Sequence, residues 1–472
     1  MGDSGSANWL KRIVLGVGLL LLLVVSVGLG VNHYFRKLGI EQLKTAVAQA
    51  DELDPGWRWE DLERNRAPVS DADNAALRVE AAYKLLPKGW LQDDSTTEEP
   101  GKTLLEVIAE LQASMPLNEA QATSLQAKLK RVQPALGEAR RLAGLRTGRF
   151  PTTAPENALS SPVGLLVQSP REIANLLWLD AALLAQSQQS DAALVSGRAI
   201  LNAGRSIGDE PLMIAHLVRM ACQRMAITGV ERVLAQGQAS EPALAATQDL
   251  FTDEAAQPIL LYALRGERAY GDVLIGWMEA GDPRGFGSVN ATGGSIFYPL
   301  LGGWMMTQNR ALKLELMTEA VEIAKRPPDE QPDRFQELNR KVKSLPQNSG
   351  TMLASLAIPA VSKVADACQR SRADLRCAVT ALAVERYRLA HGAWPETLDQ
   401  LVPRFLAQVP IDPYDRKPLR FLRLDDGVLI YSLGPDGKDD GGNIDRKKYG
   451  TPGTDLGFHL WNVDRRRQPP LP

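Results

Sequence analysis

The sequence contains few of the side chains that usually hold zinc or build a disulfide framework. It has three cysteines and four histidines in 472 residues. No two histidines stand four residues apart and no Cys-x-x-Cys pair occurs, so the spacings typical of zinc sites are missing. Cys368 and Cys377 fall in one expected helix, about 13 Å apart, which is too far for a disulfide bond. We therefore expect the cysteines to be buried free thiols.

A strong net charge of either sign is also missing. The 54 Lys and Arg residues nearly balance the 56 Asp and Glu residues, giving a formal net charge of −2. With no long basic stripe, the sequence lacks the electrostatic footprint of a nucleic-acid-binding protein. Aromatic residues make up only 6% of the chain, whereas alanine and leucine are abundant. This composition favours a mostly helical body, and the length allows two or three domains.

A long apolar run is present near the N-terminus, after a short tail at residues 1–12. Residues 13–31 read IVLGVGLLLLLVVSVGLGV and contain no charged side chain. A run of this length matches the hydrocarbon core of a bilayer. A cleaved signal peptide would have a shorter apolar region and end in a small-x-small site, whereas this run leads into NHYFRK. The sequence therefore predicts an uncleaved transmembrane helix at 13–31.

Residues 39–344 are expected to form an α-helical middle domain. A Pro-, Ser- and Thr-rich stretch indicates a possible break near residues 150–170. Beyond it the pattern is helix, short polar break, helix, which fits antiparallel hairpins. We find no fixed repeat period, so a helical-repeat solenoid and a plain α-helical domain both stay open. The expected helices cover residues 173–186, 191–203, 212–236 and 242–251.

Two short motifs in this domain suggest catalysis only weakly. The segment from Gly204 to Gly208 reads GRSIG and matches the Gly-x-Ser-x-Gly elbow of α/β-hydrolases. That elbow needs Ser206 on a strand-to-helix turn, but the preceding residues have helical composition, so we interpret the two glycines as helix-end residues. The glycine-rich residues 281–303 are not followed by Gly-Lys-Ser/Thr, which favours a surface loop over a phosphate-binding one.

The C-terminal residues 352–472 show a clear α+β pattern. Apolar residues recur at helical spacing from about residue 352 to 390, where Gly392 and Pro395 end the helix. A short helix is expected at 396–402. Strands are expected at 419–424, 428–433 and 455–461, with Asp426-Gly427 as a hairpin turn between the first two. The sequence thus predicts a long helix packed on a three-stranded antiparallel sheet.

Several ordered motifs in this region are similar to those of one family. They are ASLAIPAVSKVADA with Pro359, ALAVERYRLAHGAWPETLDQL at 381–401, VPIDPYDRKPLRF with Asp412, Pro413, Tyr414 and Pro418, YSLGPDG at 431–437, and GTDLGFHLW at 453–461. Over residues 352–461 the chain resembles the major pseudopilin of type II secretion systems, the pseudopilin G family. It departs from that family in lacking a prepilin cleavage signal at the N-terminus. Assembly into a pseudopilus through a stacked N-terminal helix is therefore not expected.

The resemblance also implies a calcium site, because the loop between the last strands binds calcium in that family. The implied ligands are the Leu433 carbonyl, Asp436 and downstream acidic residues, for which Asp445 and Asp455 are the best candidates and Asp439 and Asp440 weaker ones. The residues support this independently: YSLGPDGKDDGGNID at 431–445 holds four aspartates whose charges repel one another. Calcium takes about six to eight oxygen ligands and would offset that repulsion. The spacing is not that of an EF-hand, and a solvated acidic turn is the alternative.

Flanking charges do not orient the predicted membrane helix, because Lys11 and Arg12 on one side balance Arg36 and Lys37 on the other. Calcium sites of the extracellular type bind at about 0.1–1 mM, a level compatible with the envelope and not the cytoplasm. We therefore expect a bacterial inner (cytoplasmic) membrane protein with its C-terminal part in the periplasm.

The expected role is structural or adaptor-like, related to secretion or pilus-type assembly, with a protein partner, no catalytic residues and no identified small-molecule substrate. Two alternatives stay open. One is an enzyme in the helical middle, for which Ser206 and residues 281–303 are the only candidates. The other is a helical-repeat protein-binding module that the pilin-like part caps.

Overall fold

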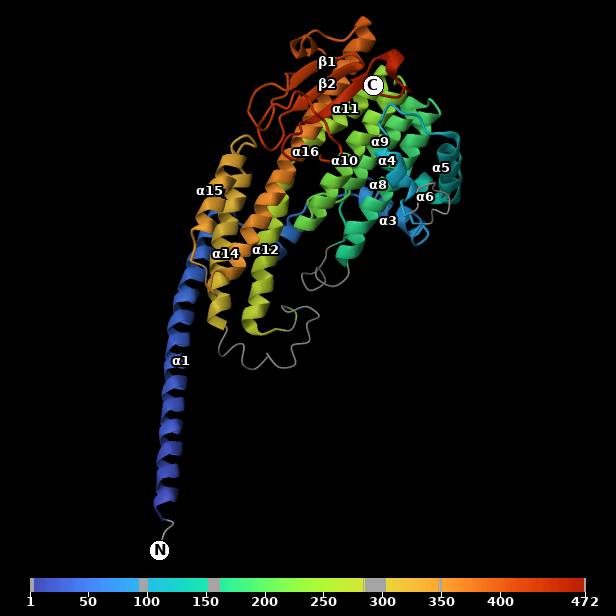
Figure 1. The fold of residues 1–472 in the computed structure, drawn as a ribbon. Helices are drawn as coiled ribbons and strands as arrows, with labels where there is room; N and C mark the ends of the chain where they lie inside the picture. Colours follow the sequence, from blue (N-terminus) through green and yellow to red (C-terminus); the bar gives the residue numbers. More distant parts are fainter. Residues whose placement is uncertain are drawn as a thin grey trace. The chain divides into compact units, whose positions relative to one another are not determined.

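The computed structural model is mainly helical, with a small three-stranded antiparallel sheet near the C-terminus (Figure 1). This confirms the coarse fold that the sequence predicts. The structure describes residues 4–92, 101–151, 162–282, 284, 303–346, 348 and 350–470.

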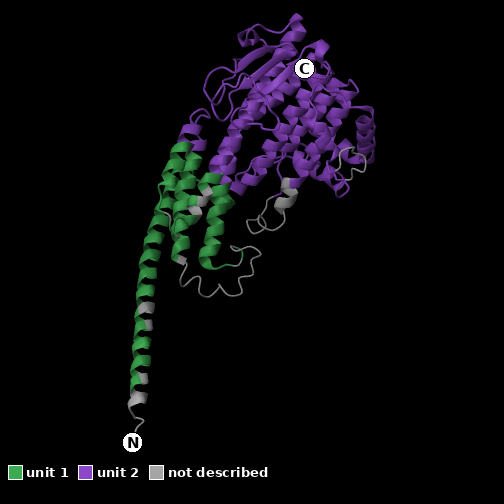
Figure 2. Cartoon of the chain, in the orientation of Figure 1, with its two compact units in different colours: residues 1–61, 267–322, 336–360 green, residues 62–266, 323–335, 361–472 purple. Residues whose placement is uncertain are grey.

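The chain forms two compact units, coloured separately in Figure 2. Unit 1 consists of Met1–Asp61, Glu267–Glu322 and Gln336–Ala360, and unit 2 of Leu62–Gly266, Ile323–Phe335 and Val361–Pro472. The predicted domains at 39–344 and 352–472 each contribute to both units. Most of the expected pilin-like part shares unit 2 with the helical hairpins, so its core is continuous with theirs.

Unit 1 contains helix α1, the start of the short helix α2 (Trp59–Arg64) and parts of four longer helices that follow later in the chain. Its buried cluster joins Ala46, Ala50 and Trp57 to Leu314, which comes from far along the chain. Arg268, which is fully buried, pairs with Asp54 and lies over the Trp57 ring, 5.5 Å from its centroid. The helices that contribute are α1 (Ser4–Leu53), α12 (Ile259–Ala280), α14 (Gly303–Ala324), α15 (Gln331–Lys343) and α16 (Met352–His391).

Residues 13–31 are helical throughout and form part of α1. The described apolar side chains of this run are exposed, for example Leu15 at 67% and Leu22 at 64%. The side chains of Leu21, Val24 and Val25 lie outside the described residues. Across the described part of the chain, no helix is identified as both long enough and apolar enough to cross a membrane. The transmembrane helix therefore stays a prediction.

The helical part of unit 2 is built around α8 (Pro162–Gln186), α9 (Ser190–Arg205), α10 (Met213–Gln236) and α11 (Glu241–Ala255), which confirms the four expected helices. Small residues let α9 and α10 approach closely: a Cβ added at Gly204 would lie 2.8 Å from the Cβ of Cys222. The shorter elements are α2 (Trp59–Arg64), α3 (Ala75–Lys84), α4 (Leu104–Glu110), α5 (Glu119–Arg131), α6 (Gln133–Arg140) and η1 (Arg141–Gly144). Of the predicted break, residues 152–161 lie outside the described residues, as does most of the glycine-rich stretch at 281–303.

A buried ionic cluster connects three of these helices. Glu254 on α11 is 1% exposed and accepts two hydrogen bonds from Arg219 of α10, each 2.7 Å long. Arg205 of α9 donates a third at 2.8 Å, and the Gln223 side chain a fourth. Burial alone would raise the pKa of Glu254, but Arg219 and Arg205 hold that pKa below its ordinary value. The carboxylate is therefore charged and neutralised inside the core.

The C-terminal elements follow the predicted order. Helix α16 ends at His391, and Gly392 at φ +76° provides the left-handed residue that terminates it. The short helix expected at 396–402 is the 3₁₀ turn η3 (Leu398–Leu401). The strands are β1 (Arg420–Leu424), β2 (Gly427–Ser432) and β3 (Leu456–Trp461), paired antiparallel in the order β1-β2-β3, and the turn η4 (Val463–Arg465) follows.

Strand β2 is buried along its whole length, because elements of unit 2 cover the sheet. The thiol of Cys377 on α16 lies 3.8 Å from the Leu456 carbonyl oxygen of β3. Glu231 of α10 accepts a 2.9 Å hydrogen bond from the His459 backbone N–H of β3. Cys222, Cys368 and Cys377 are buried and free, as the sequence predicts, and burial raises the pKa of Cys222 and of Cys368 to about 12.

Candidate functional site

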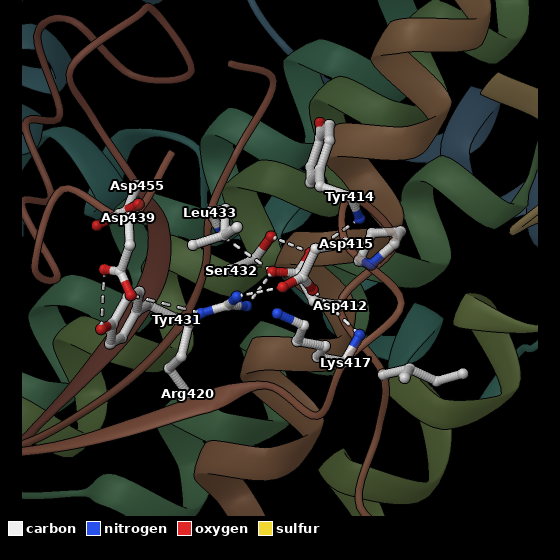
Figure 3. A network of polar contacts seen from close by, with 12 residues as sticks. Asp412, Tyr414, Asp415, Lys417, Arg420, Tyr431, Ser432, Leu433, Asp439 and Asp455 are labelled. Atoms are coloured by element: carbon white, nitrogen blue, oxygen red, sulfur yellow. Dashed lines mark hydrogen bonds and ion pairs between the residues drawn. The ribbon is translucent and has the colours of Figure 1, made fainter. Parts of the chain in front are cut away.

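The candidate site is the loop from Leu433 to Asp455, which joins β2 to β3 and contains all the predicted calcium ligands. Its base is held by Asp412, which is fully buried. Figure 3 shows this carboxylate at the centre of the polar network. It accepts hydrogen bonds from the backbone N–H groups of Tyr414 and Leu433 (both 2.9 Å), from the Ser432 hydroxyl (2.8 Å) and from Arg420 (2.6 Å). Asp412 therefore fixes where the loop leaves β2.

Asp439 lies at the edge of the same network and has protein partners for its charge. Its carboxylate accepts hydrogen bonds from the Tyr431 hydroxyl (3.2 Å) and the Gly441 backbone N–H (3.0 Å). Arg420 Nε lies 3.8 Å from its other oxygen. The Asp439 charge is thus partly neutralised by Arg420.

Asp436 and Asp445 direct their carboxylates at backbone groups of the loop. Asp436 accepts from the N–H groups of Gly453 (3.0 Å) and Lys438 (3.1 Å), and these bonds hold the pKa of Asp436 below its ordinary value. Asp445 accepts from Lys447 (2.8 Å) and Lys448 (3.3 Å) within its own turn. Asp436 therefore closes the two ends of the loop, whereas Asp445 caps a local turn.

Asp455 and Asp440 form the part of the loop whose charge the protein compensates least. Asp455 is fully buried and accepts from the N–H groups of Gly442 (2.8 Å) and Asp440 (3.5 Å). Burial raises the pKa of Asp455, and the neighbouring charges of Asp439 and Asp440 raise it further. One carboxylate oxygen of Asp440 is buried and has no hydrogen-bond partner within the described part of the chain.

The surroundings of Asp440 and Asp455 indicate how well a calcium ion fits this loop. An orphaned carboxylate oxygen beside a second buried carboxylate is the environment that a hard cation stabilises. The loop runs close to itself here, since a Cβ on Gly434, next to Leu433, would lie 3.1 Å from the Thr454 carbonyl oxygen. Over the residues that the structure describes, however, no three His, Cys, Asp or Glu side chains are grouped to hold a metal. Asp440 and Asp455 with backbone oxygens such as that of Leu433 fit the ion best, and the metal stays a proposal.

Ser206 lies at the end of α9 and is not arranged as a nucleophile. Its side chain is fully buried and its hydroxyl donates a 2.6 Å hydrogen bond to the Ala203 carbonyl of its own helix. Gly208 at φ +61° is a helix-end residue, as expected, whereas Gly204 lies inside the last turn. His216 is also buried, and its Nε2 lies 2.8 Å from the Glu210 carbonyl. The geometry gives the serine-hydrolase alternative no support.

Replacing this serine is expected to have little effect. Ser206→Ala removes only a hydroxyl bonded to its own helix, so we expect a loss of less than about 1 kcal/mol in the free energy of unfolding. Urea unfolding of both proteins measures this. Labelling of Ser206 by a fluorophosphonate probe in the folded wild type would contradict the interpretation.

Comparison with protein-family models, with curated protein sequences and with solved structures finds no match to this chain.

Proposed function

We propose that this chain is a non-enzymatic, single-pass envelope protein whose pseudopilin-like helix and sheet are stabilised by calcium and present a binding surface to a protein partner. The proposed partner belongs to a secretion or pilus-type machinery. This relation comes from the resemblance of residues 352–461 to the pseudopilin G family. It proposes the machinery in which the protein works and not how it acts there.

The observation that carries the proposal is the uncompensated charge in the loop. Asp455 is buried with a raised pKa, and Asp440 has a buried oxygen for which the described residues supply no hydrogen-bond partner. Calcium would supply the missing positive charge and bind carboxylate and carbonyl oxygens. A site of about 0.1–1 mM affinity would fill in the periplasm, which supports placing the C-terminal part outside the cytoplasm.

The apolar run at 13–31 supports the membrane anchor. Its described side chains find no apolar neighbours to bury them, as the exposures of Val14 (67%), Leu20 (61%) and Leu23 (61%) indicate. A row of exposed aliphatic side chains on one helix is costly in water and favourable in a bilayer.

Fractionation and a topology reporter test the anchor and its orientation. We expect the full-length protein to stay in the membrane pellet after carbonate washing, and a C-terminal alkaline phosphatase fusion to be active. Leu22→Arg places a charge at the centre of the run, which costs about 2.5–3.5 kcal/mol of insertion free energy and should release protein from the pellet.

Leu85→Arg is the matched control, because Leu85 is 49% exposed outside the run. It should leave the fractionation unchanged. A soluble mature form that begins near residue 32, or a C-terminal alkaline phosphatase fusion that is inactive, would overturn the proposal.

A further inference from the structure

A pocket of about 650 Å³ lies within unit 2, lined by residues of α4, α8 and α10 and by the segment after α4. This volume is in the range of small-molecule sites, about 300–1,000 Å³. Much of its wall is aliphatic or aromatic, including Leu105, Ile108, Trp178, Leu217, Val218 and Met225. The pocket is separate from the loop at 433–455 except that Arg446 also borders it.

The polarity of the pocket changes along α10. The first two turns of this helix contribute Ile214, Leu217 and Val218, its middle contributes Arg224, and its last turns contribute Glu231 and Arg232. Arg171 of α8 also lines the pocket and is exposed. At 1.5 Å per residue, Ile214 and Arg232 are separated by roughly 27 Å along the helix axis. The wall that α10 forms is therefore apolar at its N-terminal end and charged from its middle to its C-terminal end.

Most charged groups at the polar end have protein partners. Arg446 pairs with Glu231. Arg224 lies over the Tyr449 ring, 3.4 Å from its centroid, and 3.4 Å from the Asp374 carboxylate. These side chains hold the loop at 433–455 against α10 and α16, and they are neutralised without a ligand.

Arg232 is different, because its charge has no counter-ion. It is 4% exposed and donates a 3.0 Å hydrogen bond to the Met115 carbonyl oxygen. Throughout the described residues, no carboxylate pairs with it. Burial lowers the pKa of Arg232 to about 10, and no neighbouring charge opposes that shift. A buried cation without a counter-ion is unfavourable, so an anion that reached this end of the pocket would be strongly attracted.

We propose that the pocket binds a single-chain amphiphilic anion, a long alkyl chain that ends in a carboxylate or phosphate. The head group would contact Arg232, and the chain would lie along the wall formed by Leu217, Val218 and Ala221. One acyl chain spans roughly 15 Å, half of a bilayer core, which fits within the pocket's length. The alternative occupant is an acidic helix of a protein partner. Such a helix is about 10 Å wide and could bring no more than one side chain to the buried Arg232 guanidinium. This inference goes beyond the proposed function and depends on neither calcium nor the anchor.

Displacement of dansyl-labelled undecanoic acid from the full-length protein tests the proposal, with the same mixture without protein as background. We expect palmitate to displace the probe at least ten times more effectively than hexadecanol, which has the same chain without the charge. Lysophosphatidic acid, as a second competitor, decides between a carboxylate and a phosphate head group. Loss of a charge-assisted hydrogen bond weakens binding by about ten- to one-hundred-fold, so Arg232→Leu should remove the preference for palmitate over hexadecanol. Arg232→Lys should retain part of it.

Two further variants keep the result interpretable if Arg232→Leu does not fold. Ala221→Trp fills the apolar end and should abolish probe binding whatever the head group. Arg141→Leu removes a positive charge that is 62% exposed outside the pocket and should bind like wild type. Equal displacement by palmitate and hexadecanol, unchanged binding by Ala221→Trp, or displacement only by an acidic amphipathic peptide would overturn the proposal.

Discussion

Glu254→Gln is expected to lower the free energy of unfolding by about 3–5 kcal/mol at pH 7, enough to unfold a marginal domain. The substitution keeps the shape of the side chain but removes the carboxylate that pairs with Arg219, which is 3% exposed. The Arg219 guanidinium then stays charged and buried, and the ion pair with Glu254 no longer offsets the cost of removing it from water. Urea unfolding followed by circular dichroism measures the loss.

The pH dependence of this effect has a definite sign. Because the folded-state pKa of Glu254 is depressed, its stabilisation is present above the ordinary carboxyl pKa and is lost as pH falls through the folded-state value. The difference between wild type and Glu254→Gln should therefore shrink in acid. Asp253→Asn is the matched control, since Asp253 is 40% exposed and pairs with Arg205, and it should cost less than about 1 kcal/mol. A Glu254→Gln loss as small as that of the control would refute the account of the cluster.

Calcium is expected to raise the melting temperature of the full-length protein by about 5–10 °C relative to chelator. A ligand at one hundred times its dissociation constant stabilises a fold by roughly 2.7 kcal/mol, and each kcal/mol shifts the melting temperature of a unit of this size by about 2–4 °C. Differential scanning fluorimetry in EGTA and in about 10 mM calcium, one hundred times a dissociation constant of about 0.1 mM, measures this shift. The full chain is the appropriate sample, because the sheet shares unit 2 with residues 62–266.

Variants separate the calcium ligands from the other aspartates. Because the pKa of Asp455 is raised in the folded protein, its neutral form stabilises the fold, and this stabilisation is lost as pH rises through the folded-state pKa. The side chain in Asp455→Asn is neutral at every pH, so the variant keeps this stabilisation. It should melt higher than wild type in EGTA and lose the calcium shift. Asp425→Ala, in the exposed hairpin turn, should retain the shift. Asp445→Ala should also retain it, because that carboxylate caps its own turn. Identical wild-type curves in calcium and EGTA would remove the site and the argument for a periplasmic location.

Local patterns were sufficient to predict most of the elements. The end of α16 follows from Gly392, and the β1–β2 hairpin follows from Asp426-Gly427, because these residues determine backbone conformation within a few positions. The helices of unit 2 follow from apolar periodicity in the same way. The extent of the two units could not be predicted, because it depends on which distant segments share a core, as Trp57 and Leu314 do.

For the candidate site, the sequence predicts which segment forms the loop but not how its carboxylates are directed. The spacing of the aspartates places them in one loop, but the direction of each carboxylate depends on turns at Gly434, Gly441 and Gly442, all at positive φ. Sequence reasoning noted Asp412 as part of a motif and missed that it anchors the loop, since its partners Ser432 and Leu433 meet it only in the folded sheet. Likewise, nothing near Arg232 in the sequence shows that its charge would lack a counter-ion among the described residues.

The order of unit 1 along the chain has a consequence for biosynthesis. Its first segment ends at residue 61, and its second begins only at residue 267. At about 5–20 residues per second, a ribosome needs roughly 10–40 seconds to make the intervening stretch. During that time Trp57, which is 1% exposed in the folded protein, has no Leu314 to pack against. The nascent chain therefore carries an unburied apolar segment close to its N-terminus through much of translation, and that segment is a natural binding site for a chaperone.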